Sequence, residues 1–296
     1  MSEKQLTEEQ IQEYENQLRR EEKSSATIEK YIHYINSFAD WTGDRFISSE
    51  LVSNWKKELL SQGKAPTTVN GAIAAINSFF RFMEWEDCCS KFLKLQRKMF
   101  RDERKELTKS EYYTLISAAR KQGKERLALL TETICATGIR VSEVKYMTIE
   151  AVREARAEIY LKGKIRIILI PAKLCHKLLK YAQKQKIVSG EIFITRNGTS
   201  LGRRQIWAEM KNLCSAAGID EEKVFPHNLR HLFATEFYQT CRDIVKLADV
   251  LGHSSIETTR IYLLASGTEH RYQLNRMELV LILPIFYRYV FNQDKI

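Results

Sequence analysis

The sequence predicts a mainly helical protein with a small β-sheet, arranged as two domains. Only 4 prolines and 12 glycines interrupt the 296 residues, which is typical of a largely helical chain. Two short β-rich runs are joined through a Lys-Gly-Lys turn, which indicates a hairpin. At about 150 residues per domain, a chain of this length is expected to form two domains or one large one, and the composition along the chain favours two.

The N-terminal region predicts a bundle of four helices. A capping box at Thr7 and Gln10 begins the first helix. The second helix carries apolar side chains at three- and four-residue steps, namely Ile28, Tyr31, Ile32, Ile35, Phe38 and Trp41. A third helix is expected at 51–60 and a fourth at 67–85, after a Gly and a Pro that interrupt the pattern. Four such helices can enclose a hydrophobic core.

A basic stretch separates this bundle from the rest of the chain. Residues 94–109 contain seven basic and three acidic side chains with few apolar ones, a composition typical of a linker. A second capping box, Thr108 with Glu111, then begins a new helix. We therefore expect a first domain at 1–97, a linker at 98–108 and a second domain at 109–296.

The second domain is predicted to be helical around a small sheet. Residues 157–161 and 165–170 are the two β-rich runs of the hairpin. A further short strand is expected at 191–195, just before an Asn-Gly turn. From Leu201 onward the pattern returns to helix.

The charge of the chain indicates a polyanionic partner. Lys and Arg number 47 against 37 Asp and Glu, a net charge of +10. Residues 1–97 carry 13 basic and 15 acidic side chains, net −2, whereas residues 98–296 carry 34 and 22, net +12. Charge alone does not separate nucleic acid from an anionic membrane. The proportions of hydrophobic residues (44%) and charged residues (28%) exclude disordered, collagen-like and disulfide-scaffold proteins.

Compartment and membrane signals point to a soluble cytoplasmic protein. The acidic, polar start shows no secretory signal. The six cysteines form no C-x-x-C pair, so neither zinc-ribbon spacing nor a disulfide framework is indicated. The one long apolar run, 279–285, is interrupted by Pro284 and is shorter than the ~20 residues of a membrane span.

Three segments of the basic second domain carry the chemistry. They read ATGIRVSE at 136–143, HNLRHLFATEF at 227–237 and LGHSSIETTRIY at 251–262. A phosphodiester under attack develops charge on its equatorial oxygens, and planar guanidinium groups are suited to hold those oxygens. Arg140 and Arg230 are therefore predicted to form a phosphate clamp.

These segments, in this order, resemble the tyrosine recombinase (phage integrase, Xer-like) family. Its signature is an Arg in a T-G-x-R-x-x-E segment, a Lys on a β-hairpin, an H-x-x-R-H segment, an L-G-H segment and a Tyr nine residues later. The steps from Arg230 to His253, 23 residues, and from His253 to Tyr262, nine residues, fit the family. The matching positions are Thr137, Gly138, Arg140, Glu143, Lys162, His227, Arg230, His231, Leu251, Gly252, His253 and Tyr262. The N-terminal bundle resembles the family's SAM-like core-binding domain, so the resemblance covers nearly the whole chain.

The resemblance implies site-specific DNA recombination through a 3′-phosphotyrosyl intermediate. Tyr262 would attack the scissile phosphate and release a strand with a 5′-hydroxyl end. A free phenol has a pKa of about 10, so proton removal has to accompany the attack. His227, or a water it holds, is the candidate base.

The remaining site residues would support the transition state. The resemblance implies that Arg140, Arg230 and His253 stabilise the pentacoordinate phosphate. Glu143 follows Arg140 by three residues and is expected to orient a neighbour rather than to transfer a proton. His231 is interpreted as a buried structural or phosphate-adjacent residue.

The general acid is expected on the hairpin. Lys162 directly precedes the turn glycine, and the resemblance implies that the hairpin tip reaches into the minor groove and protonates the leaving 5′-oxygen. The turn K-G-K-I-R is compact, whereas the family often has one more residue there, so Lys164 is the alternative acid.

No cofactor is expected, because the phosphotyrosyl link keeps the bond energy for rejoining. The sequence contains no G-x-x-x-x-G-K-[ST] phosphate loop and no H-E-x-x-H metal helix. His227 and His231 are four residues apart, but no third ligand has suitable spacing, so no metal site is predicted.

Double-stranded DNA is the expected partner. The residues expected to bind it are Arg97, Lys98, Arg101, Arg104 and Lys105 of the linker region, and Arg203 and Arg204 at the start of a predicted helix. The resemblance also implies a tetramer on two DNA sites. The C-terminal apolar run is either the last core helix or a segment that docks into a neighbouring protomer.

Two other functions are weighed against this one. A type IB topoisomerase-like enzyme uses related chemistry as a monomer on any duplex, but the compact two-domain plan resembles recombinases more closely. A DNA-binding regulator with a decayed catalytic set is the second alternative, although none of the candidate positions has decayed. The biological task, integration and excision of a mobile element or Xer-type resolution of chromosome dimers, stays open.

Overall fold

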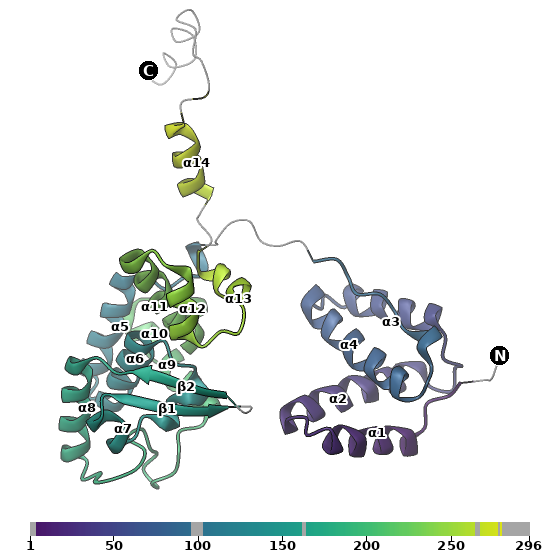
Figure 1. Ribbon diagram of the computed structural model, residues 1–296, viewed down its shortest axis with the longest axis horizontal. Coiled ribbons are helices and arrows are strands. Elements are labelled where there is room, and N and C mark those ends of the chain that lie inside the picture. The colour runs from purple at the N-terminus through teal and green to yellow at the C-terminus, as the bar shows by residue number, and fades with distance from the viewer. Residues whose placement is uncertain (1–3, 96–102, 162–163, 264–266, 278, 280–296) are drawn as a thin grey trace, which may run out of the picture. The chain divides into compact units, whose positions relative to one another are not determined.

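The chain forms two units, each with its own hydrophobic core, as the computed structural model shows in Figure 1. The units are Met1–Arg97 and Lys98–Ile296. The structure describes residues 4–95, 103–161, 164–263, 267–277 and 279. The mainly helical fold with a small sheet is confirmed.

The first unit is the four-helix bundle that the periodicity predicts. Its helices are α1 (Glu8–Arg20), α2 (Ser25–Thr42), α3 (Ser49–Ser61) and α4 (Pro66–Phe82), followed by the short 3₁₀ helix η1 (Glu86–Cys88). Thr7 and Gln10 form the capping box that begins α1. The fourth helix ends at Phe82 rather than at the predicted Trp85, because Glu84 turns the chain with a left-handed φ of 58°.

The core of this unit is built from aromatic side chains. Phe38 of α2 meets Trp55 of α3 edge-on, with 5.0 Å between ring centroids. Tyr14 of α1 packs edge-on against Phe79 of α4 at 5.3 Å, and its hydroxyl lies 2.7 Å from the Ser78 hydroxyl. Aromatic pairs of this kind contribute about 0.5–1.5 kcal/mol each beyond their buried area, so they join α2 to α3 and α1 to α4.

The second unit holds the hairpin and the remaining helices. Its elements are η2 (Glu103–Lys105), α5 (Lys109–Lys121), α6 (Glu125–Thr137), η3 (Val141–Tyr146), α7 (Ile149–Arg153), β1 (Arg156–Leu161), β2 (Lys164–Leu169), α8 (Ala172–Lys184), α9 (Arg203–Lys211), α10 (Cys214–Ala217), η4 (Glu221–Lys223), α11 (Pro226–Cys241), α12 (Ile244–Leu251), α13 (Ile256–Arg260), η5 (Ile261–Leu263) and α14 (Gly267–Arg276).

The predicted hairpin is present, and its strands have one buried and one exposed face. β1 and β2 pair antiparallel with Ile159 opposite Arg166. Ile159 and Ile168 are buried, whereas Ile165 and Ile167 are exposed. Side chains of a strand alternate between its two faces, so Arg166 shares the inward face with Ile168.

The strand predicted at 191–195 is wrong. The segment forms only isolated bridges, Thr148 to Glu191 and Ile194 to Ser200. Its consecutive residues Ile192 and Phe193 are both buried, which a half-buried strand with alternating faces does not allow. β-rich composition here reflects burial of a loop in the core.

Helix α11 and the elements packed around it position the site. Helix α11 packs against α6, α12 and η5, and α13 leads directly into η5. Figure 1 shows α12 and α13 above the hairpin. Within the described part of the chain, no helix is long and apolar enough to cross a membrane.

Candidate active site

Arg140 is placed by the tight turn that ends α6. Gly138 has a left-handed φ of 63°, and a Cβ at this position would collide with the ring of Phe233. Two residues later, Arg140 donates from its backbone N and its Nη1 to the carboxylate of Glu143, at 2.7 and 2.8 Å. Glu143 is completely buried, so its charge is held in a fixed place beside Arg140.

Arg230 lies at the centre of the site on α11. Its Nη1 donates to the carbonyl of Gly138, and its Nη2 donates to the carbonyl of Leu251 at 2.8 Å. The residue is only 2% exposed. Burial, and then the charge of Arg140, lowers the pKa of Arg230. This side chain therefore joins the end of α6 to the end of α12.

His253 follows the left-handed Gly252 that ends α12. Its Nε2 lies 3.0 Å from Nη2 of Arg230, and its Nδ1 lies 2.9 Å from the hydroxyl of Thr259. Because a guanidinium can only donate, Nε2 accepts and Nδ1 carries the proton. Burial, followed by the charges of Arg230 and Arg140, lowers the pKa of His253 to about 4, so the ring is neutral at pH 7.

Tyr262 lies on η5 with its ring among three imidazoles. The ring is stacked on His253, with 6.0 Å between centroids and an interplanar angle of 11°. It meets His231 edge-on at 4.9 Å, and His227 lies 6.3 Å away. The residue is 3% exposed. The fold thus brings the side chains of residues 227, 231, 253 and 262 together.

His227 occupies the open edge of the site at the first turn of α11. The residue is exposed, but partial loss of hydration and the charges of Arg230 and Arg140 lower its pKa. A histidine with a lowered pKa is neutral near pH 7 and can accept a proton.

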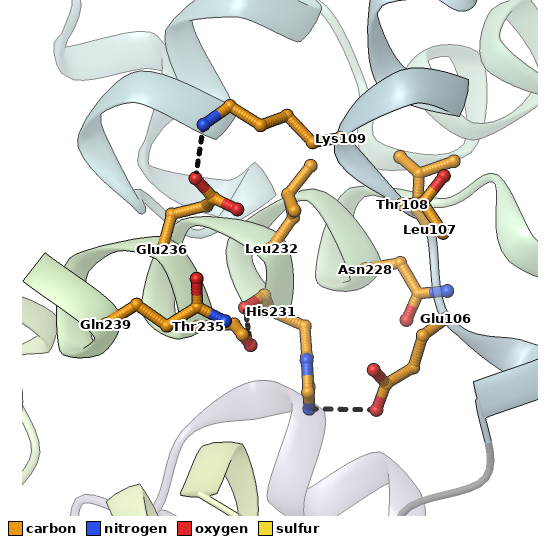
Figure 2. Close-up of a pocket in the computed structure, with 10 residues that line it drawn as sticks. All are labelled: Glu106, Leu107, Thr108, Lys109, Asn228, His231, Leu232, Thr235, Glu236 and Gln239. Carbon is orange, nitrogen blue, oxygen red and sulfur yellow. Dashed lines mark hydrogen bonds and ion pairs between the residues drawn. The ribbon is translucent and has the colours of Figure 1, made fainter.

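His231 faces a small cavity beside the site, shown in Figure 2. The cavity has a volume of about 260 Å³ and lies between α11 and residues 106–109. His231 Nε2 lies 3.8 Å from a carboxylate oxygen of Glu106. The amide of Asn228 donates to the carbonyls of Lys105 and Lys223 at 2.7 and 2.8 Å. The chain that enters this unit is therefore attached to the helix that carries His227 and Arg230.

Several predicted residues lie outside the described part of the chain. Lys162 is one of them, and for Lys164 the structure describes the backbone pairing with Leu161 but not the side chain. Of the expected DNA-binding residues, Arg97, Lys98 and Arg101 are also outside it, whereas Arg104, Lys105, Arg203 and Arg204 are exposed. The C-terminal run beyond Leu279 is not described.

Arg166 belongs to the site, and sequence reasoning missed it. Its Nη1 lies 3.0 and 2.8 Å from the two carboxylate oxygens of Glu143. Burial lowers its pKa to about 10, while the charge of Glu143 acts in the opposite direction. A charged residue on the buried face of a strand was the available signal, but β2 carries isoleucines on both faces, so the sequence alone did not identify the inward one.

The geometry combines arginine side chains, neutral histidines and a tyrosine hydroxyl. Arg140 has a side chain 40% exposed, so it can reach a phosphate at the surface, whereas Arg230 is 2% exposed. Among the described residues, no cluster of three or more His, Cys, Asp or Glu could hold a metal ion. The arrangement is suited to bind an oxyanion next to a nucleophilic oxygen.

Comparison with known families and relatives agrees with this chemistry. Residues 105–268 match the phage integrase family, and residues 11–87 match the phage integrase N-terminal SAM-like domain. The tyrosine recombinase XerA of Thermococcus kodakarensis is 30% identical over 259 residues, covering 85% of this chain and 89% of the relative. The tyrosine recombinase XerD of Halalkalibacterium halodurans is 28% identical over 260 residues, covering 82% and 86%.

Solved structures share the fold. A lambda integrase tetramer bound to a Holliday junction aligns with a TM-score of 0.70 at 18% identity, covering 86% of this chain and 76% of that chain. XerH bound to its difH substrate in a pre-cleavage complex aligns with a TM-score of 0.65 at 18% identity, covering 91% and 84%.

Proposed function

The chain belongs to the phage integrase family of tyrosine recombinases, and from that premise we propose how its site works. It is a site-specific DNA recombinase. We infer that it cleaves and rejoins DNA through a 3′-phosphotyrosyl intermediate. The relatives support this activity over relaxation of DNA by a topoisomerase and over an inactive regulator.

Tyr262 is the proposed nucleophile. The observation that carries this proposal is the packing of its ring among three imidazoles, next to Arg230. Its oxygen would form the bond to the scissile phosphorus while the bond to the 5′-oxygen breaks. His227 is the proposed acceptor of the phenolic proton, because its lowered pKa keeps it neutral.

Arg140, Arg230 and His253 are the proposed phosphate-binding groups. A phosphate oxygen could replace His253 Nε2 as the acceptor for Nη2 of Arg230. Its negative charge would then lie next to the imidazole. Negative charge favours the protonated ring, which could then donate to the phosphate. The binding of DNA itself would thus convert His253 from an acceptor into a donor.

The leaving 5′-oxygen has to be protonated, and Lys162 is the proposed acid, with Lys164 as the alternative. In the sequence both lie where β1 ends and β2 begins, and Arg166 of β2 contacts the site. Because Arg166 holds β2 only two residues after Lys164, the hairpin would carry a lysine toward DNA bound at Arg140.

Double-stranded DNA is the proposed substrate, with four copies of the chain acting on two sites. The lambda integrase tetramer on a Holliday junction supports this assembly. Exposed Arg203 and Arg204 begin α9 and would contact phosphates. We propose that the protein acts in the cytoplasm, on mobile-element or chromosomal recombination sites.

A nicked suicide substrate tests the nucleophile. After cleavage the short 5′-hydroxyl strand diffuses away, so the covalent protein–DNA adduct accumulates and can be counted on a denaturing gel. In EDTA the wild type is expected to form the adduct, and Tyr262→Phe is expected to form none, because it lacks the attacking oxygen.

Tyr272→Phe is the matched control, because Tyr272 is an exposed tyrosine ten positions further along the chain. It is expected to form as much adduct as the wild type. An adduct from Tyr262→Phe, or none from the wild type, would overturn the proposal.

A further inference from the structure

Arg166 is a largely buried cation that makes its hydrogen bonds to protein acceptors. Its side chain is 11% exposed. Nη1 donates to both carboxylate oxygens of Glu143, and Nη2 donates to the carbonyl of Val250 at 2.8 Å. Nε is buried and has no hydrogen-bond partner among the described residues. The hydrogen bonds of Arg166 thus all go to protein acceptors, on η3 and at the end of α12.

Glu143 couples Arg166 to Arg140. The carboxylate is 0% exposed and receives donors from both arginines. A buried carboxylate needs compensating charge, and the side chain of Arg140 is 40% exposed, so its charge is partly screened by solvent. Arg166 adds a second, less exposed cation on both carboxylate oxygens and so fixes the carboxylate that orients Arg140.

The second contact of Arg166 reaches the turn before His253. Val250 belongs to the last turn of α12, and Gly252 is the left-handed residue that ends this helix. A Cβ on Gly252 would lie 2.7 Å from Nε of Arg166 and would overlap its Cδ. The backbone that leads into His253 therefore lies directly on the Arg166 side chain, and only glycine permits this approach.

We propose that Arg166 is a positioning residue, which aligns Arg140, through Glu143, with the turn before His253. The same contacts anchor strand β2 to Glu143 and to this turn. It acts on the reaction through these residues and not by touching DNA. This inference rests on the proposed function of the site.

Single-turnover cleavage of the suicide substrate, at saturating DNA, tests the proposal. Arg166→Met keeps the length of the side chain and removes its charge and donors. It is expected to cleave roughly 100-fold more slowly, the size of effect that a misplacement of about 1 Å produces. Arg166→Lys keeps the charge but cannot reach Glu143 and Val250 together, so a loss of roughly tenfold is expected.

DNA affinity and thermal unfolding, measured on the same variants, separate positioning from a merely structural role. Affinity is expected to stay within about twofold of the wild type, since a residue that does not contact phosphate contributes little to binding. Arg156→Met is the matched control. Arg156 lies on β1 of the same hairpin with a side chain 52% exposed, and the variant is expected to cleave at the wild-type rate.

The outcomes are distinct. A wild type that forms no adduct would overturn the proposed function and this inference with it. A wild type that reacts, together with an Arg166→Met variant that reacts equally fast, would overturn the role of Arg166 alone. If Arg166→Met does not fold, Arg166→Lys decides: slower cleavage by folded protein with unchanged affinity supports the proposal, and wild-type cleavage contradicts it.

Discussion

Arg230 illustrates how a single buried residue serves both the fold and the site. Its two Nη atoms satisfy carbonyls at the ends of α6 and α12, and one of them also contacts His253. A buried guanidinium is costly unless its donors are used, and here they are used by the same turns that present Arg140 and His253. The same hydrogen bonds therefore satisfy the buried guanidinium and hold the turns next to Arg140 and His253 in place.

His253 is expected to make stability depend on pH. Its pKa is lowered from 6.5 to about 4 in the folded protein, so between these values the unfolded ring binds a proton that the folded ring does not. Acid therefore favours unfolding: the contribution is fully present above pH 6.5 and is lost as the pH falls toward 4.

Urea unfolding of the wild type and of His253→Gln measures the effect. The titrations run from about pH 4.5 to about pH 7, because the two pKa values of His253 are 6.5 and about 4. The slope of unfolding free energy against pH is expected to be smaller in the variant, by at most about 1.4 kcal/mol per pH unit, and by less where solvent screens the partly exposed ring. Equal slopes would show that His253 does not titrate in this way.

At the scale of elements, the junction between α6 and η3 governs the site. Gly138 ends α6, and its carbonyl accepts a hydrogen bond from Arg230, while the ring of Phe233 fills the space that a Cβ would need. The tightness of this turn brings α6 and α11 together and sends Arg140 toward the surface. A change in the turn should therefore affect stability and chemistry at once.

Gly138→Ala is expected to destabilise the protein by about 1 kcal/mol for the left-handed backbone and by about 1–3 kcal/mol more for overpacking against Phe233. Gly123→Ala is the control. Gly123 has a similar φ of 70°, but nothing lies within 4 Å of its added Cβ, so only the backbone cost applies. Thermal or urea unfolding of both variants measures the difference, and equal destabilisation would mean that Phe233 moves aside freely.

Prediction of elements succeeded where a single pattern covered a whole segment. Capping boxes at Thr7 and Thr108 begin α1 and α5 as expected, because both partners of a capping box lie within one turn of the chain. The strand predicted at 191–195 was wrong, because β-branched and aromatic residues also occur in a loop that is buried in the core. Periodicity distinguishes helix from strand, but it does not distinguish a strand from a buried irregular segment.

At the scale of the whole molecule, the distribution of charge explains how DNA could be held. Net charge is −2 in residues 1–97 and +12 in residues 98–296, so the helical bundle needs a local basic face, whereas the second unit can use bulk charge. Binding that neutralises phosphates releases counterions, so log affinity is expected to fall by about 0.9 per phosphate for each unit of log salt.

Titrations between about 50 and 200 mM salt measure this slope. Replacing Arg203 and Arg204 of α9 with Gln is expected to reduce the slope by about 0.9 for each phosphate that the variant no longer neutralises. Lys184→Gln is the control, because the Lys184 charge is already paired with Glu125 at 2.8 Å. A slope near zero for the wild type would contradict the assignment of this charge to DNA.

The sequence by itself determined the helical bundle, the hairpin and the candidate set of Arg140, His227, Arg230, His253 and Tyr262, because each is carried by short motifs whose residues are neighbours in the chain. Only the tertiary structure decided that Arg166 faces inward, and that it joins Glu143, 23 residues away, to Val250, 84 residues away. Contacts across such separations depend on how packed elements meet, and no local period encodes them.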